Sequence, residues 1–440
     1  MKNGLRLFSP LLVLLLFATL TSCNKQDSPW DGMNPFDNGG KERNMVVVIS
    51  DIHLGADLAY AECNENLEPL EELLNRLKES PNVKELVIAG DLLDEWFIPA
   101  TIDTYQGKDQ ADFVQRIATT NKGVIDALNN IIEEKEILVS YVPGNHDLTI
   151  TEASVSLILP GINQKRDPEL GLGTYTPEGI PEIAIEHGHR YNFFCAPDPI
   201  SNQDIAPGTI MPPGYFFTRL AALYVAQGKP DPADVVPVVT RNTSGDESQD
   251  LLFAYWKLWE WTANLFTIEN MFDENIFVTN VNGFTGTYSV NDLLPFQQTP
   301  GGYIDVNLYK GIQDSWDQRQ IHNRVAVSVP VLQAISNAAS ATETDDQAKI
   351  QYFLNPDSDK RIVVFGHSHV PVMVASQNSK GQKCIYANSG TWIDENPKRT
   401  TTNFIVITPQ GEDASSNTYV KLYNFENERV TLMAQDSLRY

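Results

Sequence analysis

The stretch of residues 46–53, Val-Val-Val-Ile-Ser-Asp-Ile-His, decides the fold of this chain. Its four leading residues are apolar and β-branched, which is typical of a buried strand in a sheet covered on both faces. The strand delivers Asp51 and His53 into the loop that follows it. An Asp and a His two positions apart, just beyond an extended run, can point the same way and hold one metal ion.

Similar polar loops follow four more predicted strands. The strands cover residues 85–89, 137–142, 183–185 and 361–365, and the loops read Gly90-Asp91-Leu92-Leu93-Asp94, Pro143-Gly144-Asn145-His146-Asp147, Glu186-His187-Gly188-His189 and Gly366-His367-Ser368-His369. Six of the seven histidines in the chain lie in these loops, so we expect them to converge at one edge of a sheet. Imidazoles with few carboxylates suit zinc, manganese, iron or nickel rather than calcium.

The order of these motifs (Asp-x-His, Gly-Asp-x-x-Asp, Gly-Asn-His-Asp, His, Gly-His-x-His) resembles the calcineurin-like metallophosphoesterase family. The resemblance covers residues 46 to about 195 and again about 360 to 395. It implies two divalent metal ions, with manganese favoured among manganese, zinc, iron and nickel. It also implies a ligand set in which Asp91 bridges the ions, one ion is held by Asp51, His53 and His369, and the other is held by Asn145, His187 and His367.

The resemblance further implies that His146 helps the leaving group depart, with Asp147 as its partner. Two metal ions about 3.5–4 Å apart can share a hydroxide, formed at neutral pH because the metals lower the pKa of water. Such a centre would stay positively charged and would bind and polarise a phosphate group. We therefore expect a metal-dependent phosphoester hydrolase.

The alternation of strands, polar loops and helices predicts an α/β fold. Helices are expected at Leu67–Lys78 and Asp112–Ile132. The resemblance implies a four-layer α/β/β/α sandwich, formed by residues 45–197 and 356–440. Residues 198–355, rich in Pro, Gly and aromatic side chains, are expected to form a helical cap inserted into it. The run of short strands from residue 383 onward is expected to supply a second sheet.

The chain has a formal net charge of −25, and removing residues 1–22 would take away Lys2 and Arg6 to leave −27. So acidic a chain argues against nucleic acid or an anionic membrane as the main partner. A small phosphoester is the expected substrate, and the sequence leaves the oligomeric state open. Cys63, Cys195 and Cys384 form either one disulfide and a free thiol or three small buried hydrophobes.

Residues 1–22 have the basic start and short apolar run of a signal peptide. Leu20-Thr21-Ser22-Cys23 resembles the lipobox of bacterial lipoproteins, which implies a lipid on Cys23. Residues 23–44 are then a flexible tether. This segment predicts anchoring to the inner or outer membrane of the cell envelope, facing the periplasm or the cell surface.

Several assignments stay open at this level. His187 is favoured over His189 as the metal ligand, and Asp94 either steadies a ligand or caps a helix. The aromatic residues Tyr255, Trp256, Trp259 and Trp261 form either a substrate pocket or the core of the cap. Arg219 is a candidate phosphate clamp.

A similar insertion occurs in family members that cleave UDP-diacylglucosamine, so an amphiphilic or nucleotide-like phosphoester or pyrophosphate is the expected substrate. The alternative function is a catalytically silent, metal-binding surface lipoprotein that acts through its cap in binding.

Overall fold

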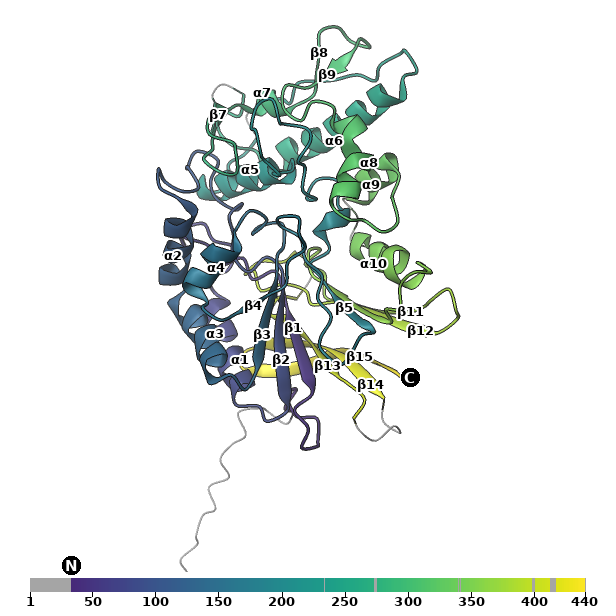
Figure 1. The fold of residues 1–440 in the computed structure, drawn as a ribbon. Helices are drawn as coiled ribbons and strands as arrows, with labels where there is room; N and C mark the ends of the chain where they lie inside the picture. Colours follow the sequence, from purple (N-terminus) through teal and green to yellow (C-terminus); the bar gives the residue numbers. More distant parts are fainter. Residues whose placement is uncertain are drawn as a thin grey trace, which may run out of the picture.

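The computed structural model describes residues 33–439, apart from 233, 273–274, 339, 341, 398–399 and 412–416. The fold is mixed α/β, with helices packed around two β-sheets (Figure 1). The predicted fold class is confirmed. The predicted signal peptide and Cys23 lie outside the described residues.

The larger sheet is built around the strand that leads into Asp51 and His53. Its seven strands, in spatial order, are β15 (Arg429–Leu438), β14 (Thr418–Glu426), β13 (Asn403–Thr408), β1 (Met45–Ile49), β2 (Val83–Ala89), β3 (Leu138–Val142) and β4 (Asn163–Gln164). Strands β1 to β4 are parallel, whereas β13 pairs antiparallel with β1 and the sheet continues through antiparallel pairs to β14 and β15. The loops that follow β1, β2 and β3 therefore open at one edge of the sheet.

The smaller sheet contains strands from both halves of the chain. Its four strands, in spatial order, are β11 (Val372–Gln377), β12 (Lys383–Asn388), β10 (Ile362–Phe365) and β5 (Ile183–Ile185). The expectation that the strands from residue 383 onward form the second sheet is wrong for most of them. Strands β13 to β15 extend the larger sheet because β13 pairs with the free side of β1, and only β12 joins β10.

Side-chain alternation divides the molecule into layers. In β1, Val47 and Ile49 pack into the cluster that the outer helices cover, while Val46 and Val48 pack against the smaller sheet. On the far face of the smaller sheet, Phe365 packs with residues of α10 (Glu343–Ala348) and η2, a π-helical turn (Lys349–Phe353). The layers are thus helices, larger sheet, smaller sheet and short helices.

The outer helices cover the larger sheet on the side facing away from the smaller one. They are α1 (Leu67–Lys78), α2 (Gln110–Thr120), α3 (Lys122–Glu134) and α4 (Glu152–Ile158). The helix expected over Asp112–Ile132 is two helices, broken at Asn121. There the backbone leaves helical geometry (φ −108°, ψ 39°), and the side-chain amide donates to the carbonyl of Gly55 (2.8 Å).

Residues between β5 and β10 add a region with its own hydrophobic cluster, centred on side chains such as Phe216, Trp256, Trp259 and Trp316. Its elements are η1, a 3₁₀ turn (His189–Tyr191), α5 (Gly214–Ala226), α6 (Glu247–Leu265), β6 (Phe277–Val278), β7 (Thr287–Tyr288), α7 (Val290–Leu293), β8 (Phe296–Gln297), β9 (Ile304–Asp305), α8 (Ile312–His322) and α9 (Val331–Asn337). Helices α5 to α9 gather at one end of the molecule (Figure 1). We call residues 198–355 the cap; these boundaries stay a prediction.

None of the helices in the described residues combines the length and apolarity that crossing a membrane needs. Of the two alternatives for the cysteines, the disulfide is excluded, because Cys63, Cys195 and Cys384 are all free thiols, the first and last of them buried.

Candidate metal centre

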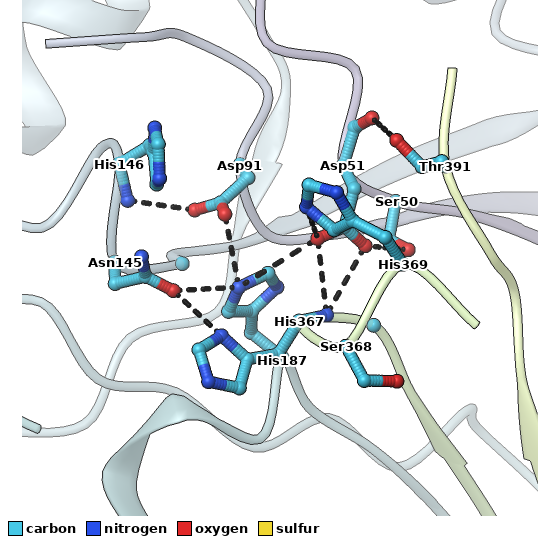
Figure 2. A network of polar contacts seen from close by, with 12 residues as sticks. Ser50, Asp51, Asp91, Asn145, His146, His187, His367, Ser368, His369 and Thr391 are labelled. Carbon is cyan, nitrogen blue, oxygen red and sulfur yellow. Dashed lines mark hydrogen bonds and ion pairs between the residues drawn. The ribbon is translucent and has the colours of Figure 1, made fainter. Parts of the chain in front are cut away.

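The five predicted loops meet at one place (Figure 2). Six of the seven predicted metal ligands gather there together with His146 in Figure 2, and the seventh, His53, lies beside His369 and Asp91. They come from loops after β1, β2, β3, β5 and β10. Two of these strands belong to the smaller sheet, so the site lies where the loops of both sheets converge.

The backbone at the site is strained. Asp51, His53, Asp91, His367 and His369 all have positive φ values, between 51° and 68°. This left-handed region is uncommon for residues with side chains, and such residues cluster at functional sites. The strain lets each strand end turn sharply, so that side chains from different loops face the same point.

Glycines keep the loops close together. A Cβ on Gly144 would lie 2.1 Å from Asp91 Oδ1, and one on Gly366 would lie 2.4 Å from Asp51 Oδ2. Glycine is therefore required at these two positions because the backbone packs closely against the carboxylates.

One group of candidate ligands consists of Asp51, His53 and His369. The Nε2 atoms of the two histidines lie only 3.2 Å apart, and His369 Nε2 is 3.2 Å from Asp51 Oδ1. His53 Nδ1 bonds to Asp94 Oδ2 (2.9 Å). Because that bond occupies Nδ1, Nε2 is the nitrogen that faces the group.

The second group consists of Asn145, His187 and His367. Asn145 Oδ1 lies 3.0 Å from His187 Nε2 and 2.9 Å from His367 Nδ1. His187 Nδ1 donates to the backbone carbonyl of Ala89 (2.9 Å), which again leaves Nε2 facing inward.

Asp91 lies between the two groups. Its Oδ2 is 3.1 Å from His187 Nε2 in one group and 3.7 Å from His53 Nε2 in the other. Its Oδ1 accepts the backbone N–H of His146 (2.8 Å). Burial alone would raise the pKa of Asp91, but the neighbouring histidines, His187 foremost, hold it well below its usual range.

The donor set fits divalent cations. Lone-pair atoms face one another at about hydrogen-bond distance, and only an added proton or cation makes such contacts favourable. Burial would lower the pKa of His53, yet the bond to Asp94 and the charges of Glu62 and Asp91 raise it to about 10. The electrostatic field at this point therefore attracts positive charge, and imidazole, carboxylate and amide donors are those that zinc, manganese, iron and nickel accept.

The loops are fastened from behind by the turn at residues 388–391. The Thr391 hydroxyl donates to the carbonyl of Asp51 (2.9 Å), and the Ser50 and Ser389 hydroxyls lie 2.6 Å apart. These bonds fix the position of Asp51, so this turn has a structural role at the site.

His146 lies beside the two groups, but its predicted pairing with Asp147 is wrong. His146 Nδ1 bonds instead to Asp94 Oδ1 (2.9 Å). The Asp147 carboxylate is turned to the backbone and accepts the N–H groups of Gly144 (2.6 Å) and Leu92 (2.9 Å). It therefore ties two loops together, while Asp94 holds both His146 and His53.

Two neighbours of these histidines were not predicted from the sequence. The ring of Trp96 stacks on that of His146 at 5.0 Å, and Glu62 Oε2 lies 3.5 Å from His53 Nδ1. Trp96 follows the Gly-Asp-x-x-Asp motif by two residues, so its position was a usable signal. Glu62 lies in a loop without any such pattern.

The other candidates lie outside the two groups. His189 is buried, and its Nε2 donates to the carbonyl of Gly171 (3.0 Å), which favours His187 as the ligand. Arg219 is fully buried and directs its guanidinium to backbone carbonyls, so it is not placed to clamp a phosphate. Tyr255, Trp256 and Trp259 are core side chains, whereas Trp261 is 58% exposed.

Residues 45–218 match the family model described as calcineurin-like phosphoesterase. These residues belong to that family. The matched residues contain the first four motif loops, whereas His367 and His369 lie beyond the match in sequence and reach the site through β10.

No curated protein matches the chain. Among solved structures, a crystal structure of nuclease MPE from Pseudomonas putida matches at 19% identity with a TM-score of 0.20. The matched region covers 33% of this chain and 54% of that one, so the chain spans about half the length of the nuclease.

Proposed function

We propose that the chain is a phosphoric ester hydrolase that works through a two-metal centre. The observation that carries the proposal is the pair of ligand groups that share Asp91, with His146 held beside them. The phosphoesterase family of residues 45–218 supports hydrolysis of a phosphoester.

In this proposal Asp51, His53 and His369 would hold one ion, and Asn145, His187 and His367 would hold the other. Asp91, which lies near both groups, would serve both ions. When bound, two divalent ions lower the pKa of water and neutralise the charge on a phosphate. Manganese is the favoured metal of the proposal.

The part of His146 follows from its hydrogen bonds. Asp94 occupies Nδ1, so Nε2 is the nitrogen available to exchange a proton with substrate. Asp94 also raises the pKa of His146, against the opposing effect of burial, which favours the protonated form. His146 thus gives a proton to the oxygen of the departing alcohol as the bond between phosphorus and that oxygen breaks.

The test is metal-dependent hydrolysis by the full chain. The protein is stripped of metal, reloaded with manganese, zinc or nickel, and given p-nitrophenyl phosphate and bis-p-nitrophenyl phosphate in parallel. We expect turnover that depends on metal and is lost in Asp91→Ala and His146→Ala, with Asp112→Ala on the surface of α2 as the control. Two bound metals without turnover on either ester would contradict the hydrolase and support a binding role.

We also propose that the hydrolase is lipid-anchored in the cell envelope. The proposal rests on the apolar run at residues 11–17 and on Leu20-Thr21-Ser22-Cys23, both outside the described residues. Expressed in a bacterium fed a labelled fatty acid, the chain should take up label and enter the detergent phase on phase separation. Cys23→Ala should abolish both results, and uptake of label by Cys23→Ala would contradict the anchor.

A further inference from the structure

A cavity of about 360 Å³ lies between the metal centre and the cap. We call it the roof pocket. Asp91, Asn145, His146, His367 and His369 line one side of it. The pocket is therefore continuous with the centre at which a phosphoester would be cleaved, and its volume lies in the range of small-molecule sites.

The rest of the lining is mainly apolar. It is formed by Phe194, Phe217 of α5, Leu258 and Trp261 of α6, and Trp96. Trp261 is the informative member, since the neighbouring tryptophans of α6 are buried in the cap core and Trp261 is 58% exposed. A large exposed aromatic side chain at the wall of a cavity gains from an apolar occupant that removes it from water.

Trp96 connects the pocket to His146 through direct side-chain contacts. Trp96 stacks on His146 and also contacts Tyr215 of α5 edge-on, with ring centroids 6.2 Å apart. A Cβ on Gly214, at the start of α5, would lie 3.3 Å from the Trp96 ring. A group in the roof pocket therefore lies beside the histidine that serves the departing alcohol.

The charge and hydrogen-bonding groups of the pocket limit the kinds of leaving group that it can bind. No lysine or arginine is among the described residues that line the pocket, so a leaving group carrying further phosphates would find no cation there. The indole N–H of Trp96 is buried and has no hydrogen-bond partner. Asn192 and Thr218 also line the pocket, but Asn192 is hydrogen-bonded to Glu343 and to the backbone N–H of Phe194, and the Thr218 hydroxyl donates to the carbonyl of Gly214. Their polar atoms are thus paired within the protein, which favours an apolar occupant.

We propose that the roof pocket binds the leaving group of the substrate and that this group is apolar, an alkyl or aryl alcohol esterified to phosphate. The inference rests on the proposed function and specifies its substrate class. Hydrolysis breaks the bond from phosphorus to the alcohol oxygen and forms one to the oxygen of water. The alcohol leaves with a proton, and phosphate, or its remaining ester, is the second product.

The test is a chain-length series of n-alkyl phosphates, from ethyl to hexyl, with glycerol phosphate and a nucleoside monophosphate alongside. Each is offered as the monoester or as its methyl diester, whichever form the p-nitrophenyl esters show to be preferred, and product is measured at saturating metal. Each methylene group that enters an apolar site raises kcat/KM by up to about 4-fold. We therefore expect kcat/KM to rise about 10- to 100-fold over the series. The alkyl esters should also exceed the two polar substrates.

Trp261→Ala should flatten this dependence on chain length. Its matched control is Tyr303→Ala, which removes another exposed aromatic side chain of the cap outside the pocket and should keep the full slope. Both side chains are more than half exposed, so neither substitution opens the core.

The possible failures are distinguishable. Hydrolysis of p-nitrophenyl esters with no dependence on alkyl length, or with a preference for the nucleotide, would overturn the apolar leaving group and leave the hydrolase standing. An equal slope in Trp261→Ala and the unsubstituted chain would also overturn it. Absence of turnover on every ester would overturn the proposed function and this inference with it.

Discussion

Two buried polar clusters in this molecule, the metal centre and the surroundings of Arg219, differ in how their polar atoms are paired. At the metal centre, acceptor and lone-pair atoms face one another, as His53 and His369 do across 3.2 Å. In the cap, Arg219 donates to the carbonyls of Ile98 (2.7 Å), Ala100 (3.1 Å) and other residues of the same loop. The facing ring nitrogens of the first cluster need an added proton or metal ion between them, whereas the second cluster contains its own cation, the guanidinium of Arg219.

The difference separates a binding site from a structural bond. Buried polar atoms are normally paired, so a cluster of acceptors without donors indicates a ligand of positive charge. The donors of Arg219 bond backbone carbonyls and the Tyr215 hydroxyl, so they hold parts of the protein together rather than a substrate. Substitutions in the first cluster should therefore act on activity, and substitutions in the second on stability.

The largest expected effect is that of Asp94→Asn. The substitution replaces an acceptor that holds both His53 and His146 with a group that carries a donor. Loss of the hydrogen-bond partner of a metal ligand lowers metal affinity or activity by about 10- to 100-fold. Loss of a positioned general acid lowers the rate by about 100-fold or more. We expect kcat/KM to fall at least about 100-fold at saturating metal, with the circular dichroism spectrum unchanged.

The control is Asp112→Asn, which removes a carboxylate paired on the surface of α2. Unaltered kcat/KM in Asp94→Asn would show that His146 and His53 do not depend on this carboxylate.

Arg219→Met should break the second cluster. Several buried carbonyls would lose their donor, and each unmade bond to a charged group costs about 1.5–3 kcal/mol. We expect the free energy of unfolding to fall by about 3 kcal/mol or more, measured by urea denaturation, with KM unchanged at low temperature. Arg241→Met, at an exposed arginine, is the control. Normal stability with a raised KM would instead identify Arg219 as a phosphate clamp.

A smaller effect, on the pH dependence of folding stability, is expected from Glu343. Burial raises the pKa of this carboxyl to about 7, partly opposed by the hydrogen bond from Asn192. The folded state thus holds the proton more tightly than the unfolded state, so stability is fully present below pH 4.5 and is lost as pH rises toward and through 7. The loss is at most about 3 kcal/mol.

Glu343→Gln removes this titration. Urea denaturation at pH 5 and pH 8 should therefore show that the variant gains stability relative to the unsubstituted chain as pH rises. Glu269→Gln, at an exposed position, serves as the control. Parallel pH dependence in Glu343→Gln and the unsubstituted chain would contradict the assignment.

The sequence predicted most of the candidate site because its residues occupy fixed places after strands. Asp51, Asp91 and His146 each follow a parallel strand, and parallel strands bring their carboxyl ends to one edge. Two features were not predictable in this way. Sheet membership of the strands after residue 400 depends on which edge of β1 is free, since their apolar alternation fits either sheet.

The partner of His146 was also beyond the reach of spacing. Asp147 is next to it in sequence, yet the turn points that carboxylate at the amides of two loops, and Asp94 reaches His146 from another strand end. Contacts between loops of different strands are decided by packing. In the cap, likewise, burial alone distinguishes Trp259 in the core from Trp261 at the pocket.

The most direct test is the number of metal ions that the chain holds. The purified full chain is loaded with manganese, desalted and analysed by elemental analysis and electron paramagnetic resonance. Two ions per chain with spin coupling between them are expected, and one uncoupled ion in His53→Ala and in His187→Ala, which each remove a ligand from a different group. At most one ion in the unsubstituted chain, or two in both variants, would contradict the two-metal centre.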